Sequence, residues 1–270
     1  MAEQKAPAKP SRAKASKQKK NCSKSDESAA GYIQPPDMPW YFEEDAGPGK
    51  IISEVFRSTE DKLITRNRKR ITLLMLSGGI DSVYGLVKLL KESDDIVIAH
   101  HVHLINHEGR HQQEAKACEA IVEYCKREYR DFKYTQSLID RRKFKAFGID
   151  AITVACEAGI VVQSFYADTG SLVDRWTIGI NAEDVAEFDP EDTDSHRTPS
   201  MLRAMEANCH PHKPPQLFNL PLRPKRDLME YIGSELTGMC WTCRTPATSD
   251  NGEVSECGEC HTCKIMAEIR

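Results

Sequence analysis

The sequence predicts an α/β protein with a doubly wound parallel sheet and a C-terminal metal-binding segment. From residue 71 onward, short apolar runs alternate with stretches of helical periodicity, and a Gly-Gly turn joins the first run to the first periodic stretch. A group of cysteines stands near the end of the 270-residue chain. Strands that alternate with helices form parallel sheets, which bind ligands beyond the carboxyl ends of the strands.

The first strand is expected at residues 71–76, which form an unbroken apolar run, and a helix follows the glycines because apolar residues recur there at helical spacing. The second strand is expected at residues 95–104 and the next helix at 108–129. The apolar stripe of that helix includes Cys118 and Cys125, so we expect both thiols in the core.

The later elements follow the same alternation. We expect a strand at residues 132–138, a helix at 152–166 and a strand at 176–180. A fifth strand at 217–222 precedes a helix at 224–236, which has proline suitably at its first turn. The Gly-Gly turn and the segment after the fourth strand then open on the same edge of the sheet.

The chain divides into three parts. Residues 1–30 hold eight Lys and Arg against one Glu before Ser25, which predicts a disordered basic tail able to contact protein or nucleic acid. Residues 31–68 are an N-terminal extension, and the sequence indicates no function for them. Residues 69–270 form the main domain, which includes the cysteine segment 240–263.

The bulk numbers exclude some classes of protein. A formal net charge of −4 gives no overall basic field for nucleic acid. No run approaches the roughly 18 apolar residues of a membrane span, and the start lacks a signal-peptide pattern. Half of the ten cysteines lie in the last 31 residues at metal-ligand spacing, which favours a reducing compartment over disulfides. We therefore expect a cytoplasmic protein without membrane contact.

The Gly-Gly turn reads Ser77-Gly78-Gly79-Ile80-Asp81-Ser82. Two glycines let the backbone approach a phosphate with its amides turned inward, and the start of the following helix adds partial positive charge. The two serine hydroxyls can donate to phosphate oxygens, and the aspartate can hold Mg2+ or brace the turn. The alternative is an ordinary strand-to-helix turn.

This string resembles the PP-loop of the adenine nucleotide alpha-hydrolase-like superfamily, whose members bind ATP, cleave it between the α and β phosphates and release pyrophosphate. It lacks the Gly-Lys-Ser/Thr of a Walker loop. The resemblance implies adenylation of a substrate oxygen, with Ser77, Asp81 and Ser82 as catalytic residues. It also implies ATP contacts from Leu76, Ser77, Gly78, Gly79, Ile80, Asp81, Ser82, Val83, Tyr84, Gly85 and Leu86.

The C-terminal segment has the spacing of a metal knuckle. Cys257, Cys260 and Cys263 stand at two-residue intervals, so that successive sulfurs can point at one ion. Cys243 is the best fourth ligand, with Cys240 a close rival and His261 a weaker one. Four thiolates favour a closed, structural Zn2+ site, while an iron–sulfur cluster or unligated cysteines are the alternatives.

Together, the turn and the ending Trp-Thr-Cys with Cys-Gly-Glu-Cys-His-Thr-Cys-Lys resemble the QueC family, the 7-cyano-7-deazaguanine synthases, over residues 71–270. Supporting segments are Gly109-Arg110-His111 with Glu114, residues 178–184, and Pro221-Leu222 before Lys225. Family members convert 7-carboxy-7-deazaguanine, ammonia and ATP into the nitrile preQ0 for queuosine or related deazaguanines. They proceed through an adenylated acid, an amide and a second activation that dehydrates the amide.

The resemblance also implies roles for single residues. Lys225 would neutralise phosphate charge in the transition state, and the alternative is a surface cation at a helix start. Asn181, Glu183, Asp184 and Arg197 would bind the deazaguanine, although Asp184 could be a strand-end cap. Family members often pair, so a homodimer is expected.

The chain also departs from the family pattern. The family's aromatic-Pro-Asp-Cys-Arg-Pro stretch is replaced by residues 192–199, and thirteen residues separate Cys243 from Cys257, which is more than usual. A paralogue that stops at the amide, or joins the activated deazaguanine to another amine, is therefore an alternative. Others are a tRNA-modifying PP-loop enzyme and an inactive zinc- and nucleotide-binding subunit.

Histidines are frequent between residues 100 and 111, which suggests a metal site at first sight. Alternate residues of a strand face opposite sides, however, so this set cannot converge on one ion. We expect polar residues at a strand end and loop, one of which could line the substrate pocket.

Overall fold

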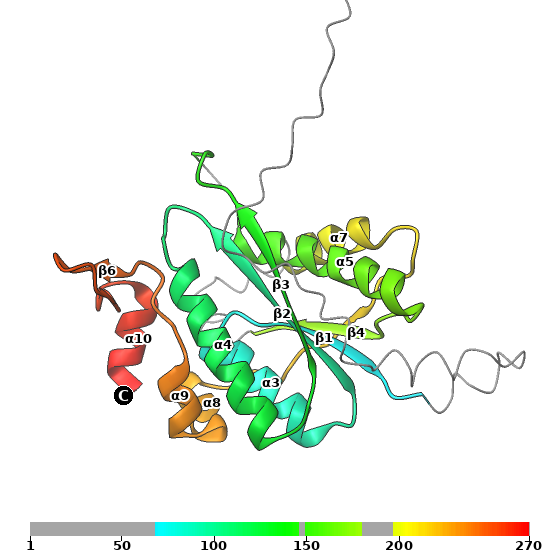
Figure 1. The fold of residues 1–270 in the computed structure, drawn as a ribbon, viewed down its shortest axis with the longest axis horizontal. Coiled ribbons are helices and arrows are strands. Elements are labelled where there is room, and N and C mark those ends of the chain that lie inside the picture. Colours follow the sequence, from blue (N-terminus) through cyan, green and yellow to red (C-terminus); the bar gives the residue numbers. More distant parts are fainter. Residues whose placement is uncertain (1–67, 146–148, 180–196, 270) are drawn as a thin grey trace, which may run out of the picture. The chain divides into compact units, whose positions relative to one another are not determined.

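A five-stranded parallel sheet forms the centre of the main domain (Figure 1). The computed structural model describes residues 68–145, 149–179 and 197–269. Neighbouring strands are parallel throughout the order β3-β2-β1-β4-β5, which confirms the predicted doubly wound sheet. The strands are β1 (Ile71–Met75), β2 (Ile96–Ile105), β3 (Lys133–Asp140), β4 (Arg175–Ile178) and β5 (Gln216–Leu217).

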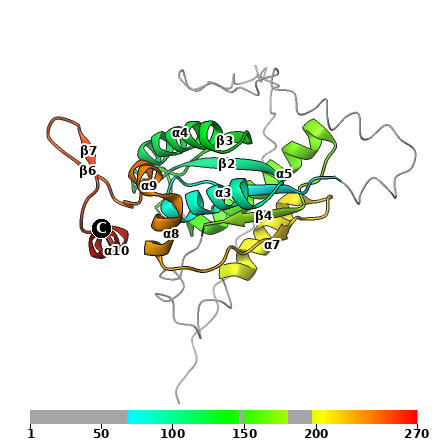
Figure 2. The ribbon, with the colours of Figure 1, turned by 90° about the horizontal axis from the view of Figure 1, so that it is seen from below.

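Helices cover both faces of this sheet (Figures 1 and 2). One face packs against α3 (Ile80–Glu92), α4 (His111–Glu128), α8 (Lys225–Ile232) and α9 (Ser234–Met239). The other face packs against α5 (Asp150–Thr169) and α7 (Arg197–Cys209), which lie side by side. The central strand β1 is buried along its whole length because its residues alternate between the two layers, Leu74 toward the first and Leu73 toward the second.

The direction of the strand order reverses between β1 and β4. The helices that follow β1 and β2 lie on one face, whereas those that follow β3 and β4 lie on the other. Helix α3, which follows β1, and helix α7, which follows β4, therefore lie on opposite faces of the sheet. Sheets of this class bind ligands at the carboxyl edge of such a switch point.

The predicted core residues of α4 are confirmed, since Cys118 and Cys125 are fully buried. The prediction of one helix over 224–236 is wrong, because Gly233 adopts φ +86° and separates α8 from α9. The predicted fifth strand is also too long. It ends at Leu217, ahead of Pro221, which has no amide to donate.

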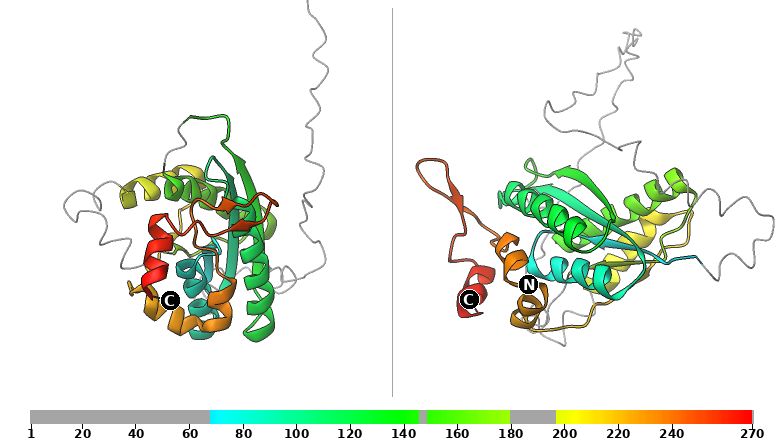
Figure 3. Two further views of the ribbon diagram at one scale, coloured as in Figure 1. Left: turned by 90° about the vertical axis from the view of Figure 1, so that its left-hand side faces the viewer. Right: turned by 60° about the horizontal axis from the view of Figure 1, so that its bottom comes forward.

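Several elements were not expected from the sequence. Helix α7 begins at Arg197, in the stretch that departs from the family pattern. Strands β6 (Ala247–Thr248) and β7 (Val254–Ser255) form an antiparallel hairpin that extends away from the main sheet, and α10 (His261–Ile269) follows it (Figures 2 and 3).

Residues 1–67 lie outside the described residues, so the basic tail and the N-terminal extension stay predictions. In the described ranges, no helix is long and apolar enough to cross a membrane.

The contact between α5 and α7 provides a test of the packing. A Cβ added to Gly159 would lie 2.6 Å from the Cβ of Asn208 and 2.8 Å from the carbonyl oxygen of Met205. We expect Gly159→Ala to lower the free energy of unfolding by about 1–3 kcal/mol, as overpacking does, measured by urea denaturation. Gly238→Ala in α9 is the matched control, since its Cβ would meet nothing within 4 Å, and it should cause no loss. Equal effects of the two changes would contradict the predicted contact.

Candidate active site and metal centre

The turn between β1 and α3, residues 77–82, is held together by its two serines. The Ser82 hydroxyl donates to the Gly79 carbonyl at 3.0 Å and accepts from the Ser77 amide at 3.1 Å. The two hydroxyl oxygens are 3.1 Å apart, and the Gly79 amide donates to Ser77 Oγ at 3.3 Å. Both hydroxyls are therefore fixed at the start of α3, which has no side-chain cap hydrogen bond among the described residues.

Two glycines allow the turn to fit between its neighbours. Gly78 has φ +78°, and a Cβ there would approach the Glu114 carbonyl oxygen to 3.0 Å and the Cys118 sulfur to 3.2 Å. Gly179, directly after β4, lies against the first turn of α3, and its Cβ would be only 2.4 Å from the Ser82 amide nitrogen. The turn is thus enclosed by α4 on one side and the end of β4 on the other.

A cavity of about 260 Å³ opens beside this turn at the carboxyl edge of the sheet. Its charged lining consists of Asp81, Arg110, Glu114, Asp150, Lys225 and Arg244, and its apolar lining includes Met75, Leu76, Ile80, Val102, Leu104, Ala151, Val154 and Ile178. A site with fixed polar groups on one side and an apolar wall on the other is typical of small-molecule binding.

Lys225 brings a positive charge to the turn. It is the first residue of α8, yet it is only 4% exposed, and its Nζ lies 3.7 Å from Asp81 Oδ2. This position differs from that of an exposed helix-start cation. A buried ammonium beside the turn is suited to hold negative charge, because attraction is stronger away from bulk water.

A network of ion pairs forms another part of the cavity wall. Arg110 pairs with Glu108 at 3.1 Å and with Glu114 at 3.3 Å. It also pairs with Asp150, which forms a second ion pair with Arg244 at 3.5 Å. Burial raises the pKa of Glu114, although Arg110 opposes that effect. The sequence motif indicated Arg110 and Glu114 as site residues. It did not indicate Asp150 and Arg244, because they belong to distant segments that only the fold brings to this wall.

Two neighbouring histidines of β2 line the cavity and face opposite sides of the strand. His100 bonds to Thr135 Oγ1 at 2.8 Å and Ser137 Oγ at 3.0 Å, and burial lowers its pKa to about 3. His101 Nδ1 lies 2.9 Å from the Leu76 carbonyl oxygen, which can only accept, so Nδ1 carries the proton. Burial lowers the pKa of His101 to about 4. Both rings are therefore neutral near pH 7.

His101 also leaves one nitrogen unsatisfied. The residue is 1% exposed, and its Nε2 has no hydrogen-bond partner among the described residues. Because Nδ1 holds the proton, Nε2 is an acceptor on a buried side chain of the cavity wall. This is the histidine that best fits the expectation of a pocket-lining ring.

The cysteine cluster consists of Cys243, Cys257, Cys260 and Cys263, whose sulfur atoms all lie within 4.8 Å of one another. The sulfur of Cys257 is 3.6 Å from that of Cys243 and 4.0 Å from that of Cys263. Tetrahedral Zn–S bonds of about 2.3 Å require sulfurs about 3.8 Å apart, so the spacing fits one ion. Cys240 stands apart, with its thiol donating to the Leu236 carbonyl at 3.2 Å.

The electrostatics of the cluster also suit a cation. Hydrogen bonds from Thr245 and from the amides of Cys260 and Glu259 lower the pKa of Cys257 to about 6. Burial raises the pKa of Cys243 and Cys263, so a bound cation is needed to favour their thiolates. The four residues could therefore hold a metal ion.

The side chains of the four predicted deazaguanine ligands all lie outside the part of the chain that the structure describes. Asn181, Glu183 and Asp184 lie outside the described residues. Arg197 is the first residue of α7, and the position of its side chain is likewise outside them. Their roles stay predictions.

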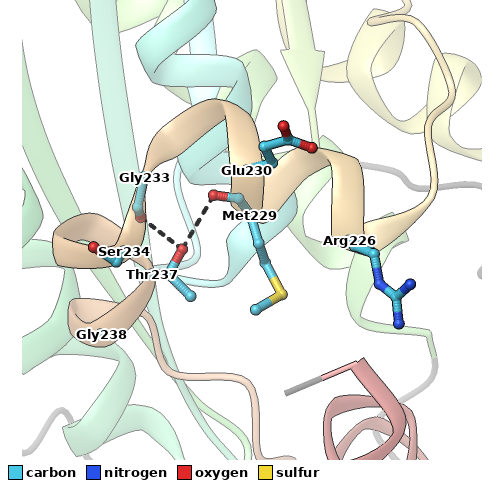
Figure 4. A pocket seen from close by; sticks show the side chains of 7 residues that line it. All are labelled: Arg226, Met229, Glu230, Gly233, Ser234, Thr237 and Gly238. Carbon is cyan, nitrogen blue, oxygen red and sulfur yellow. Dashed lines mark hydrogen bonds between the residues drawn. The ribbon is translucent and has the colours of Figure 1, made fainter.

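A second depression lies on α8 and α9 (Figure 4). Its lining residues are Arg226, Met229, Glu230, Gly233, Ser234, Thr237 and Gly238. Thr237 Oγ1 donates to the Gly233 carbonyl at 2.7 Å, so this hydroxyl already serves the helix backbone. No residue of the turn 77–82 lines it, and we assign the chemistry to the cavity at the sheet edge.

Comparison with known proteins gives only remote likeness. No family model and no curated protein matches the chain. The U34-tRNA thiolase NcsA from Methanococcus maripaludis, solved with its [4Fe-4S] cluster, is similar at 15% identity and TM-score 0.38, over 71% of this chain and 63% of the thiolase. This chain therefore spans less than two thirds of the thiolase's length.

Two synthetases are similar at the same level. NMN synthetase from Francisella tularensis matches at 12% identity and TM-score 0.32, over 63% of this chain and 76% of that one. Glutamine-dependent NAD+ synthetase from Acinetobacter baumannii, solved with ADP, matches at 14% identity and TM-score 0.29, over 46% and 24%. Likeness this remote supports no conclusion about function.

The buried histidines predict a pH dependence of stability. Unfolded histidine has a pKa of about 6.5, so between pH 6.5 and pH 4 the unfolded chain binds a proton at His101 that the folded chain does not. This contribution to stability is complete above pH 6.5 and is lost as the pH falls toward 4. We expect His101→Asn to reduce the pH slope of the unfolding free energy by up to about 1.4 kcal/mol per unit, measured by urea denaturation between pH 6 and 5, inside this window. An unchanged slope would show that His101 is not a buried neutral ring.

Proposed function

We propose that the protein uses ATP to adenylate a carboxylic acid, and that the acid is 7-carboxy-7-deazaguanine, which ammonia then converts to the amide and a second activation to the nitrile preQ0. The observation that carries ATP use is the juxtaposition of the turn 77–82 with buried Lys225 at the switch point of the sheet. The deazaguanine substrate rests on the combined turn and cysteine motifs.

The turn and Lys225 supply the groups that pyrophosphate release requires. The Ser77 hydroxyl, which lines the cavity, donates to a phosphate oxygen, while the Ser82 hydroxyl holds the turn through the Gly79 carbonyl. The partial positive charge of the α3 start favours the same anion. Lys225 neutralises charge that develops as the bond between the α and β phosphates breaks. Asp81 orients Lys225 and offers a carboxylate to Mg2+, which would offset phosphate charge when bound.

The chemistry balances over two similar steps. The carboxylate oxygen attacks the α phosphorus and displaces pyrophosphate, after which ammonia displaces AMP to give the amide. Adenylation of the amide oxygen then releases a second pyrophosphate, and loss of AMP together with both protons of the amide nitrogen leaves the nitrile. Glu114, with its raised pKa, is placed in the cavity to accept a proton from ammonium.

The cysteine cluster has a structural role in this proposal. Four sulfur ligands close the coordination sphere of Zn2+ and leave no position for water or substrate. The ion would stabilise the C-terminal segment, whose described residues bury few apolar side chains.

The substrate proposal is tested with ATP, ammonium and 7-carboxy-7-deazaguanine, read by mass spectrometry and a pyrophosphate assay. We expect the nitrile, with two pyrophosphates released per product molecule. The amide with one pyrophosphate would instead identify the paralogue that stops halfway. No pyrophosphate with any deazaguanine acid or amide would contradict the assigned substrate.

The residue roles are tested by Ser77→Ala and Lys225→Met. Each removes a group that binds the leaving phosphates, so we expect kcat to fall about 100- to 1000-fold while the zinc content stays that of the parent protein. The matched control is Lys264→Met, an exposed lysine of α10 outside the cavity lining, which should leave kcat unchanged. Retained activity in both site variants would refute the roles given to the turn and to Lys225.

A further inference from the structure

Trp241 joins the C-terminal segment to the turn 77–82. Its backbone amide donates to the Gly78 carbonyl at 3.0 Å. Its own carbonyl oxygen would lie 3.6 Å from a Cβ on Gly79. One residue of the distant C-terminal segment thus contacts both glycines of the turn.

The other end of Trp241 reaches the cysteine cluster. The indole Nε1 donates to the Cys243 carbonyl at 2.9 Å, and the Cys243 sulfur is 3.6 Å from that of Cys257. The ring is half-buried and packs against the core cluster beneath α3 and α4. Trp241 therefore connects a cluster residue with the turn through two hydrogen bonds, one from its indole and one from its backbone amide.

The same segment forms part of the cavity wall. Thr242, Arg244 and Thr262 line the cavity together with Trp241. Arg244 lies 3.5 Å from Asp150, and Thr242 Oγ1 donates to Glu256 Oε1 at 3.1 Å. The cavity is consequently complete only when residues 241–262 are in place.

Few side chains of this segment are fully buried. Among the described residues after Met239, the buried side chains are Cys240, Cys243, Cys263 and Met266, of which two belong to the cluster. With so few apolar contacts, closure of the four sulfurs on an ion is a main source of order here.

We propose that Trp241 couples the two sites, so that metal in the cysteine cluster strengthens nucleotide binding at the turn and bound nucleotide strengthens metal retention. This coupling rests on the proposed function, because it places a nucleotide at the turn. Linkage requires the same factor in both directions, and couplings of this kind amount to about 5- to 150-fold.

The experiment measures zinc loss from the full-length, zinc-loaded protein to a chromogenic chelator, with and without α,β-methylene-ATP, which cannot be cleaved between those phosphates. A protein-free mixture corrects for zinc held by the nucleotide. We expect the analogue to raise the apparent zinc affinity at least about fivefold, and zinc to lower the analogue's Kd, measured by calorimetry, by the same factor.

The variant Trp241→Phe tests the route. Phe fills the space beside the core and keeps the backbone bond to Gly78, but it cannot donate to Cys243. We expect it to retain its circular dichroism spectrum and zinc at saturation while losing the coupling in both directions. The control Thr248→Val changes an exposed side chain of the β6–β7 hairpin, which lies between Cys243 and Cys257 in the chain, and should keep the coupling.

The outcomes separate the two proposals. If the analogue binds but zinc retention does not respond, the coupling is wrong and the proposed function stands. If the analogue does not bind the zinc-loaded protein at all, the proposed function fails as well. Coupling that persists in Trp241→Phe shows that it does not pass through the indole hydrogen bond to Cys243 and overturns that part of the proposal. If this variant fails to fold, the reciprocal measurements on the parent protein still decide whether coupling exists.

Discussion

The arrangement at the sheet edge depends on two backbone positions where no side chain fits. Gly78 lies against α4 with φ +78°, and Gly179 lies against the first turn of α3, so close that a Cβ would overlap the Ser82 amide. These contacts hold the start of α3 between its neighbours. Because the turn is fixed, Ser77, Asp81 and Lys225 line one cavity, which can present organised donors to an anion.

Much of the fold could be predicted because its signals are local. Apolar periodicity located the main strands and helices, and their alternation gave the parallel sheet that the structure has. The errors lie where local signals are weak. Helix α7 has a mixed sequence pattern, and its buried residues are defined only by its packing against α5. Apolar periodicity continues past residue 232, but Gly233 ends the helix there.

The site was predictable to the extent that its residues are consecutive. The turn 77–82 was visible in the sequence, as was the cysteine knuckle, and the structure also shows which further cysteine stands with the other three. The burial of Lys225 and the inclusion of Asp150 and Trp241 in the cavity were not predictable. Each results from packing between segments that are far apart in the chain, which no local spacing encodes.

The β6–β7 hairpin occupies the long interval between Cys243 and Cys257. Its strands pair with each other, its described side chains are largely exposed, and the cysteine cluster holds only its base. Lengthening a loop whose ends are already fixed costs little entropy. The hairpin can therefore gain or lose residues over evolutionary time without disturbing the sulfurs, so the length of this interval is a poor marker of ancestry and the geometry at its two ends is a better one.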